Sequence, residues 1–545
     1  MAIDEKVRDG AGLGTRGYPD LRDHLANLEA AGLLVRVKRE INKDTELHPL
    51  VRWQYRGGIP EDQRKAFLFE NVVDNRGKKY RYSVAVGALA ASKYVYAVGM
   101  RCKPEEIEAK WRHALTHLID PVIVDGGPVH EEVHTGSELL AEGLGEFPIP
   151  ISTPGFDNAP YTTCTHWFTK DPETGIRNQG NYRGQIKSPT RVGIYPMSGQ
   201  HIHIHINKCR ERGQPLQAAL VIGVPPAVSY ATVQKVPYGV DELSIAGGLI
   251  GQPIQLVKCK TVDLEVPAEA ELVIEGLITT EYLEPEGPFG ESHGYMHPRL
   301  LNPYMDVTAI THRKDMIYVS FISQVTPSES SVIKKMGYDI MFLKHLRDDL
   351  SIKSVKRVVM HEPLTNLRKF IIVQMSKPSK TEVWRALHAA ATFHHGVGKI
   401  VVAVDDDIDP DNVDAVLWAM CYRMKPHQDI QIIEGMDKGH APPFAGISVT
   451  DERASYHGTM DDSALLINAI LKEPFPPVSL PKREYMERAK EIWEELGLPT
   501  LRPETPWYGY SLGQWNEELE EEAELALRGE HYKTGEKQAR QRVKA

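Results

Sequence analysis

Two carboxylates flank a tight turn in the segment Glu286-Gly-Pro-Phe-Gly-Glu291. Gly287 and Gly290 permit backbone conformations that are closed to other residues, and Pro288 fixes its own φ, so the turn can direct both side chains into one cleft. Like charges held close together push pKa values apart, so one carboxyl can carry a proton near neutral pH while the other stays ionised. The spacing therefore indicates an acid–base pair, with an ordinary turn bearing two solvated acids as the alternative interpretation.

A second pattern, His130-Glu-Glu-Val-His134, has the spacing with which a helix brings two histidines to one face around zinc. The context opposes a helix, because Gly126-Gly-Pro precedes the pattern, Gly136 follows it, and Val129 and Val133 favour extended backbone. In a strand the two histidines still share a face, whereas the glutamates lose the position of a general base. A zinc hydrolase that uses this pattern is kept as an alternative hypothesis.

Two further patterns give weaker evidence for a functional site. Gly12-Leu-Gly-Thr-Arg-Gly17 fits the dinucleotide fingerprint, but no strand precedes it, and the fingerprint works only between a strand and a helix. The run His201-Ile-His-Ile-His205 places three imidazoles on one face of an expected strand and the isoleucines on the other. We interpret one of these histidines as a candidate ligand, because a hydrogen-bonded strand residue explains any single histidine without one.

The composition is that of a globular protein with several domains, since 545 residues include 41% hydrophobic and 25% charged residues. A formal charge of −10 is mild for this size, so nothing favours nucleic acid or an anionic membrane as the main partner. No stretch approaches the ~18 apolar residues of a membrane span, and we expect a cytoplasmic protein. The five cysteines include no Cys-x-x-Cys pair, which argues against a disulfide framework and a zinc knuckle.

The pattern of apolar residues predicts three kinds of structure along the chain. An amphipathic helix over 19–32 and a strand over 33–37 open the chain, and a glycine- and proline-rich stretch at 124–160 is expected to link this α/β unit to the next domain. Short β-rich runs dominate 161–325, as in a sheet-built or barrel-like domain. Strands and helices alternate over 330–475, with Asp409-Pro410 as an expected helix start, and the last ~65 residues are helical, ending in a docking helix and then a fraying tail.

Several motifs follow one another in the middle of the chain, namely Asn178-Gln-Gly-Asn-Tyr-Arg183, His201, Gly239-Val-Asp-Glu242 and Glu286-Gly-Pro-Phe-Gly-Glu291. In this order they resemble the UbiD family of decarboxylases, which use prenylated FMN. The resemblance extends from about residue 19 to 475, because Asp20-Leu-Arg-Asp-His-Leu and Lys399 with its following Asp405-Asp-Asp-Ile-Asp also look like that family. Two stretches, Thr326–Ser331 and Gly435–Pro443, depart from it and leave the substrate unassigned.

The resemblance implies a four-part α/β fold and a cofactor site. Residues 1–125 would form an N-terminal α/β unit, 126–328 a split β-barrel that binds prenylated FMN, 329–475 an α/β oligomerisation domain, and 476–545 a charged helical extension. Asn178, His201 and Glu242 match the family's Mn²⁺ ligands, and an amide oxygen, an imidazole and a carboxylate suit this ion. Lys399 matches the family's lysine on the phosphate side, and a K⁺ site made mostly of backbone oxygens would accompany the manganese.

The family's catalytic Glu, Arg and Glu fall on Glu286, Arg183 and Glu291. Arg183 would orient a carboxylate bidentately, Glu286 would stay ionised against it, and Glu291 would deliver the proton that replaces CO₂. In this family the substrate carbon bonds covalently to the prenylated flavin, which accepts the electrons left by CO₂.

The resemblance therefore predicts a carboxy-lyase that reversibly decarboxylates an aromatic or α,β-unsaturated acid or its thioester. The expected partners are the carboxylic acid, CO₂, a prenyl-FMN synthase that supplies the cofactor, and further copies of the chain in a homodimer or homohexamer. The alternatives are a non-catalytic partner subunit that binds the prenylated flavin and the zinc hydrolase at His130 and His134.

Overall fold

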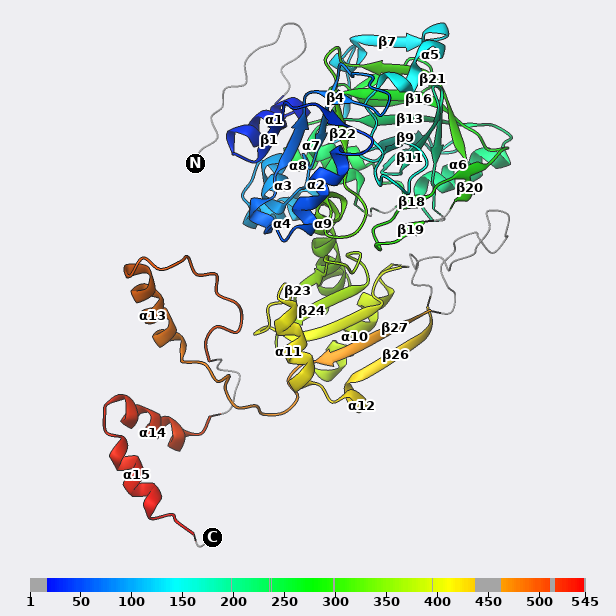
Figure 1. Cartoon of the computed structure of the whole chain (residues 1–545). Coiled ribbons are helices and arrows are strands. Elements are labelled where there is room, and N and C mark those ends of the chain that lie inside the picture. The colour runs from blue at the N-terminus through cyan, green and yellow to red at the C-terminus, as the bar shows by residue number, and fades with distance from the viewer. Residues whose placement is uncertain are drawn as a thin grey trace. The chain divides into compact units, whose positions relative to one another are not determined.

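Figure 1 shows the fold, a computed structural model that describes residues 17–197, 199–234, 236, 238–297, 299–394, 396–436, 462–509 and 515–543. The described residues form two compact units. The first contains the described residues up to Phe342 together with Met360–Lys369, and the second contains Leu343–Val359, Phe370–Met436 and the described residues from Ser463 onwards. In the part of the chain described, no helix is both long and apolar enough to cross a bilayer.

A four-stranded sheet opens the first unit. Its order is β1 (Leu34–Val37), β3 (Ala66–Phe69), β5 (Ser83–Val86) and β22 (Ile317–Ser320), and only β3 and β5 run antiparallel. Helix α1 (Leu21–Ala30) begins with a capping box at Asp20 and ends before Gly32, whose φ is +69°. The helix and strand predicted at 19–37 are therefore confirmed. The unit also contains α2 (Leu47–Arg56), α3 (Lys93–Met100), α4 (Ile107–Ala114) and the paired strands β2 (Ile41–Asn42) and β4 (Val72–Val73).

An antiparallel sheet, nine-stranded within the described residues, forms the centre of the first unit. Its order is β10 (Arg177–Gly180), β9 (His166–Lys170), β13 (Leu216–Ile222), β16 (Leu272–Ile278), β21 (Tyr304–His312), β12 (Arg191–Ile194), β11 (Gly184–Ser188) and β8 (Tyr161–Thr162), and β7 (Glu132–Thr135) also pairs with β21. Smaller strands are β6 (Val122–Ile123), β14 (Gln255–Lys258), β15 (Glu265–Pro267), β17 (Glu284–Glu286), β18 (Phe289–Gly290), β19 (Met296–His297) and β20 (Leu300–Asn302). The β-rich middle region is as predicted.

The stretch 124–160 is more than the predicted linker. It contains β7, α5 (Ser137–Ala141) and two single-turn helices, η3 (Pro128–His130) and η4 (Gly143–Glu146). Strand β12 pairs with only the first residues of β21, Tyr304 to Asp306, and β7 pairs with the last four, Ala309 to His312. The linker prediction is therefore wrong in this part, because the long β21 needs a second partner for its exposed backbone groups.

Helix α6 (His201–Glu211) replaces the strand predicted for the histidine run. The buried residues Ile202, His205, Ile206 and Cys209 recur at the helical spacing, and the helix packs against β9, β10 and β13. Packing on the sheet thus overrides the β propensity of the isoleucines. Consequently His201 and His205 lie on the same face of the helix, whereas His203 lies on a different face. The same region also contains the helices α7 (Pro226–Thr232), α8 (Glu242–Ile250) and α9 (Glu329–Lys344).

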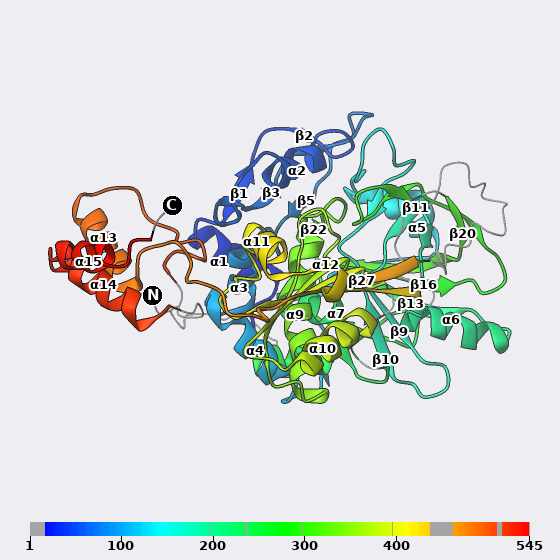
Figure 2. The same ribbon diagram turned by 90° about the horizontal axis from the view of Figure 1, so that it is seen from below.

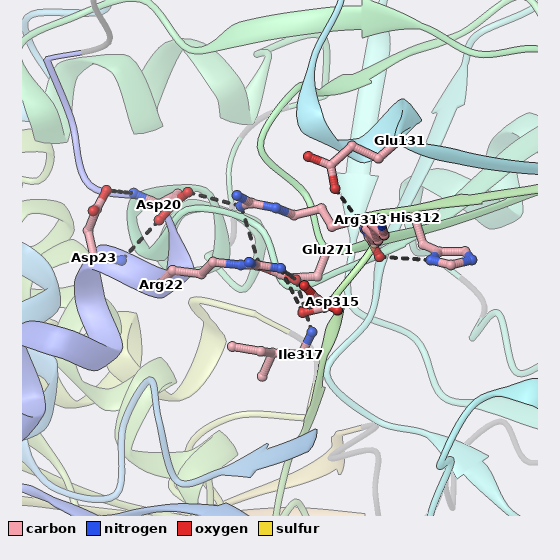
Figure 3. A network of polar contacts seen from close by, with 10 residues as sticks. Asp20, Arg22, Asp23, Glu131, Glu271, His312, Arg313, Asp315 and Ile317 are labelled. Atoms are coloured by element: carbon pink, nitrogen blue, oxygen red, sulfur yellow. Dashed lines mark hydrogen bonds and ion pairs between the residues drawn. The ribbon is translucent and has the colours of Figure 1, made fainter. Parts of the chain in front are cut away.

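A buried ion network joins the start of the chain to the central sheet, as Figure 3 shows. Glu271 is fully buried, and its carboxylate accepts hydrogen bonds from Arg22 Nε at 2.9 Å and from the backbone N–H of Ile317 at 2.9 Å. Arg313, which directly follows β21, lies 3.4 Å from the same carboxylate and donates to Asp20 at 3.0 Å. Glu271 thus has its charge compensated from both sides, as a buried carboxylate requires.

The second unit is built around a five-stranded sheet with the order β23 (Val355–Met360), β24 (Phe370–Met375), β25 (Ile400–Asp405), β27 (Asp462–Ala469) and β26 (Ile430–Met436). Strands β24, β25 and β27 run parallel, and α10 (Lys380–Thr392) and α11 (Val413–Arg423) cover opposite faces of the sheet in Figure 2. The short helix α12 (Pro426–Asp429) follows α11. The alternating α/β pattern predicted from the sequence is confirmed.

Asp409-Pro410 does not start α11, contrary to the prediction. The N-cap is Asn412, whose side chain accepts from the backbone N–H of Ala415 at 3.2 Å. Asp409 instead accepts from the N–H of Asp411 and pairs with Arg357, so its carboxylate is engaged in a turn. The helix begins at the next residue whose side chain is free to cap it.

The C-terminal segment is helical, as predicted, with α13 (Arg483–Glu495), α14 (Glu517–Leu527) and α15 (His531–Ala539). None of the residues described in these three helices is buried. The docking role predicted for this segment stays a prediction.

Candidate functional site

The turn between the two carboxylates is held by Tyr161 on β8 and by Asn158, which precedes that strand. Asn158 Nδ2 donates to the carbonyl oxygen of Gly287 at 2.9 Å, and the Tyr161 hydroxyl donates to that of Pro288 at 3.3 Å. Gly287 has a φ of +104°, which excludes residues with a Cβ, whereas a Cβ at Gly290 would lie 2.6 Å from the side chain of Gln324. Both glycines are therefore required, the first for its backbone angle and the second for close packing.

Arg183 lies between the two carboxylates. Its Nε and Nη2 donate to the two oxygens of Glu286 at 2.8 and 2.6 Å, and its Nη1 donates to Glu291 Oε1 at 2.6 Å. Asn302 Nδ2 adds a contact to Glu286 at 3.3 Å. The structure thus brings together the three residues that the sequence assigned to catalysis, in a fork geometry that only arginine provides.

The two carboxylates differ in their access to solvent. The side chain of Glu286 is fully buried, that of Arg183 is 6% exposed, and that of Glu291 is 17% exposed. The guanidinium also packs over the rings of Tyr195, at 4.4 Å, and Phe289, at 5.1 Å. Burial opposes the charge of Arg183, but Glu286 and Glu291 outweigh it and raise the pKa of the guanidinium. Arg183 is therefore a fixed cation, and Glu291 is the acid with an opening toward solvent.

A second polar cluster forms around strand β10. His201 Nδ1 lies 3.0 Å from Asn178 Oδ1, and the backbone N–H of Gln179 donates to Glu242 Oε2 at 3.2 Å. Asn178 comes from β10, His201 is the first residue of α6 and Glu242 is the first residue of α8. The three residues predicted to bind a metal thus lie around one strand.

Glu242 is buried without a cationic side chain paired to it among the described residues. It is 3% exposed, and burial raises its pKa to about 8 against the opposing hydrogen bonds from backbone N–H groups. The amide nitrogen of Asn178 and both amide atoms of Gln179 are also buried without a hydrogen-bond partner. Buried polar atoms are normally satisfied, so this cluster has the character of a site for a bound ion or ligand.

The remaining predicted site residues are distributed as follows. Lys399 belongs to the second unit and directly precedes β25, so its assignment stays a prediction. Asn302, Tyr195 and Asn158 could not be predicted from the sequence, because each reaches the site through a contact with a residue elsewhere in the chain. Gly12, Gly14 and most of Gly435–Pro443 lie outside the described residues.

The zinc-protease pattern does not form a helix, as the sequence context predicted. His130 ends η3 and His134 lies on β7, so the backbone is extended from Glu132 onwards. The ring of His134 stacks on that of His312, with the ring centroids 5.1 Å apart. The arrangement required of a hydrolase with this pattern is absent from these described residues.

The comparisons with known proteins agree with this site. Two family profiles match, the 3-octaprenyl-4-hydroxybenzoate carboxy-lyase Rift-related domain over residues 122–325 and the C-terminal domain of the same family over 331–446. Together they cover more than half of the chain, which therefore belongs to the UbiD family.

Solved and curated relatives match over most of their length. The chain is 31% identical to an evolved dimeric form of the UbiD-class enzyme HmfF from Pelotomaculum thermopropionicum, solved with prFMN, over 85% of this chain and 97% of that one, with a TM-score of 0.72. It is 25% identical to the vanillic acid decarboxylase of Sedimentibacter hydroxybenzoicus, over 88% and 99%, with a TM-score of 0.72. It is 28% identical to the phenolic acid decarboxylase of Bacillus subtilis, over 76% of this chain and 87% of that one. The protein is thus a carboxy-lyase with the α/β multidomain fold that the sequence predicted.

Proposed function

We propose that this protein reversibly decarboxylates an aromatic or α,β-unsaturated carboxylic acid with prenylated FMN as its cofactor. The observation that carries the proposal is the buried fork of Arg183 on Glu286 and Glu291, because it pairs a fixed cation with one buried and one accessible carboxylate. The similarity to HmfF, which was solved with prFMN, supports the cofactor.

The residues around β10 fit the phosphate end of a flavin nucleotide. Asn178, His201 and Glu242 offer an amide oxygen, an imidazole and a carboxylate, a set that suits Mn²⁺. A cation there would stabilise the ionised form of Glu242, which burial alone disfavours. Helices α6 and α8 both begin at this cluster, and their N-termini favour an anion such as the phosphate that the metal would hold. Lys399 and a K⁺ ion are proposed to complete the phosphate side.

The chain also positions this cluster near the catalytic fork. Asn178 and Arg183 are five residues apart, so their Cα atoms lie at most about 18 Å from each other. A cofactor held by its phosphate at Asn178 would therefore lie within reach of Arg183. When bound, prenylated FMN supplies the electron acceptor for the carbon that loses CO₂.

The protein residues contribute orientation and a proton. Arg183 holds the acid in place by a charge-assisted hydrogen bond and stays paired with Glu286 beside it. The bond between the substrate carbon and its carboxylate breaks, CO₂ leaves, and a proton from the Glu291 carboxyl is transferred to that carbon. In the reverse direction the Glu291 carboxylate takes the proton from carbon and CO₂ is added. The turnover of a proton through Glu291 requires its access to solvent, which Glu286 lacks.

A panel of aromatic and α,β-unsaturated acids, assayed for CO₂ release by the flavin-loaded protein, tests this proposal. Glu291→Gln is expected to lower turnover about 10²–10⁴-fold, the usual contribution of a general acid, while the flavin stays bound. Glu281→Gln is the matched control, because Glu281 is exposed near the same turn and is expected to keep full activity. Turnover of Glu291→Gln at the rate of the control would remove the proton donor from the proposal.

The alternative is a non-catalytic subunit that binds the prenylated flavin for a partner. The complete Arg183, Glu286 and Glu291 set argues against it, since a binding subunit needs no proton donor. In that case the loaded protein would release no CO₂ from any acid of the panel.

A further inference from the structure

Two histidines and a glutamate gather on the central sheet away from the catalytic fork. His134 on β7 lies opposite Ile310 on β21, so that His312, two residues further along β21, is on the same face of the sheet. The Nε2 atoms of His134 and His312 are 3.0 Å apart, and Glu146 Oε2, at the end of η4, is 4.0 Å from His134 Nε2. One ligand atom from each of the three residues lies within 4.8 Å of the others.

The hydrogen bonds around the cluster leave its ligand atoms directed inward. His312 Nδ1 lies 2.9 Å from the backbone carbonyl oxygen of Arg313, as Figure 3 shows, and can only donate to it. The proton is therefore on Nδ1, and Nε2 carries a lone pair. The Tyr82 hydroxyl donates to Glu146 Oε1 at 2.7 Å, which leaves Oε2 for the cluster. Metal-bound histidines and carboxylates have such outer partners in most known sites.

The position of His312 is fixed by aromatic packing. The residue is fully buried, and the rings of Tyr82 and Phe147 meet its ring nearly edge-on, at centroid distances of 5.6 and 5.3 Å. The ring of His134 stacks parallel to it, at an angle of 8°. The site is thus rigid on one side and partly open at His134 and Glu146.

We propose that His134, Glu146 and His312 bind one Zn²⁺ ion, at a site separate from the flavin cluster. Zinc–nitrogen and zinc–oxygen bonds of about 2.0–2.2 Å in tetrahedral geometry place neighbouring ligand atoms roughly 3.3–3.5 Å apart. The two separations from His134 Nε2, 3.0 and 4.0 Å, lie on either side of that value, and all three ligand atoms lie within 4.8 Å of one another, so side-chain adjustments of about 1 Å complete the site. Two imidazoles favour Zn²⁺ over Mg²⁺ and Ca²⁺, which prefer oxygen ligands, and water supplies the fourth position.

The ion would tie the segment that carries β7 and η4 to the end of β21. Its ligands are far apart in the chain, since 178 residues separate His134 from His312. The competing explanation is a plain hydrogen bond between the two Nε2 atoms, in which His134 donates to His312 and no metal is bound. The two explanations differ in what Glu146 does, because the hydrogen bond does not need it and the metal does.

Zinc binding by the full-length protein in the Glu242→Gln background tests the site, since that background removes the carboxylate of the flavin cluster. The chelator-treated protein is titrated with ZnCl₂ against a chromophoric chelator, and the visible absorption of bound Co²⁺ gives an independent measurement of the ligand set. We expect one Zn²⁺ per chain, lost on adding Glu146→Gln or His134→Asn and retained on adding His113→Asn. His113 is the matched control, because it is an exposed histidine stacked on another, His117, in α4.

A milder substitution keeps the test independent of folding. Tyr82→Phe removes only the hydroxyl that orients Glu146, and we expect it to weaken zinc binding about 10-fold without loss of stoichiometry. Absence of stoichiometric zinc in the Glu242→Gln protein, or equal zinc binding with and without Glu146→Gln, would overturn the proposal. Neither result bears on the proposed decarboxylation, which uses other residues.

Discussion

Replacing Arg183 by methionine removes the central cation of the site and leaves an unbranched apolar side chain in its place. Three charge-assisted hydrogen bonds are lost, two to Glu286 and one to Glu291. Glu286 then stays fully buried, with only the 3.3 Å contact from Asn302 among the contacts described above. Breaking a buried ion pair in this way costs about 3–5 kcal/mol, because an uncompensated charge remains in the interior.

The double variant Arg183→Met/Glu286→Gln separates the charge from the shape. It removes the orphaned carboxylate, so we expect it to recover a large part of the lost stability, although both proteins are inactive. Urea unfolding, followed by tryptophan fluorescence and by circular dichroism, provides the measurement. Arg183→Lys is the matched control, since it keeps a positive charge but loses the fork. Equal urea midpoints for Arg183→Met and the unsubstituted protein would refute the reasoning, as would a double variant less stable than Arg183→Met.

Three further predictions follow from the same geometry. Glu242→Gln is expected to abolish the binding of Mn²⁺ and of the flavin while the fold is kept. Metal analysis, flavin absorbance and circular dichroism measure these three properties, and retained manganese would remove Glu242 from the ligand set. Glu329 accepts hydrogen bonds from the backbone N–H groups of Gly87 and Leu89, and burial raises its pKa to about 7. Between pH 4.5 and 7 the folded protein therefore binds more protons than the unfolded one, so its stability should fall by about 3 kcal/mol as the pH rises through that range. Glu329→Gln should flatten this dependence, and an unchanged pH profile of unfolding would contradict it. Tyr195→Leu removes a ring 4.4 Å from the guanidinium and should lower stability by about 1–2 kcal/mol, measured by urea unfolding against Tyr422→Leu as an exposed control.

The sequence predicted the fold well where local patterns agree with tertiary packing. Helix α1 combines a capping residue, an apolar stripe and a closing glycine, and all three signals point to the same structure. The histidine run failed because its alternating isoleucines favour a strand, while the sheet beneath it selects the helical spacing of buried residues. Asp409 failed as a cap because its carboxylate serves a turn and an ion pair instead. Propensity is a weak signal when a side chain has several possible partners.

The candidate site was predictable only in part from the residues themselves. The spacing of Glu286 and Glu291 indicated a carboxylate pair, but their contact with Arg183 spans more than 100 residues and came from the resemblance to a family. His134 was noticed for its spacing from His130, whereas its partner in the structure is His312 on a neighbouring strand. Contacts of this kind depend on sheet pairing, which a single sequence does not specify.

Cofactor content tests the central claim most directly. The protein is co-expressed with a prenyl-FMN synthase and purified, its absorption spectrum is recorded, the released small molecule is identified by mass, and manganese is measured in the same sample. We predict prenylated FMN with about one Mn²⁺ per chain, and neither in the Glu242→Gln protein. A protein that carries no flavin and no manganese under these conditions would contradict the assignment.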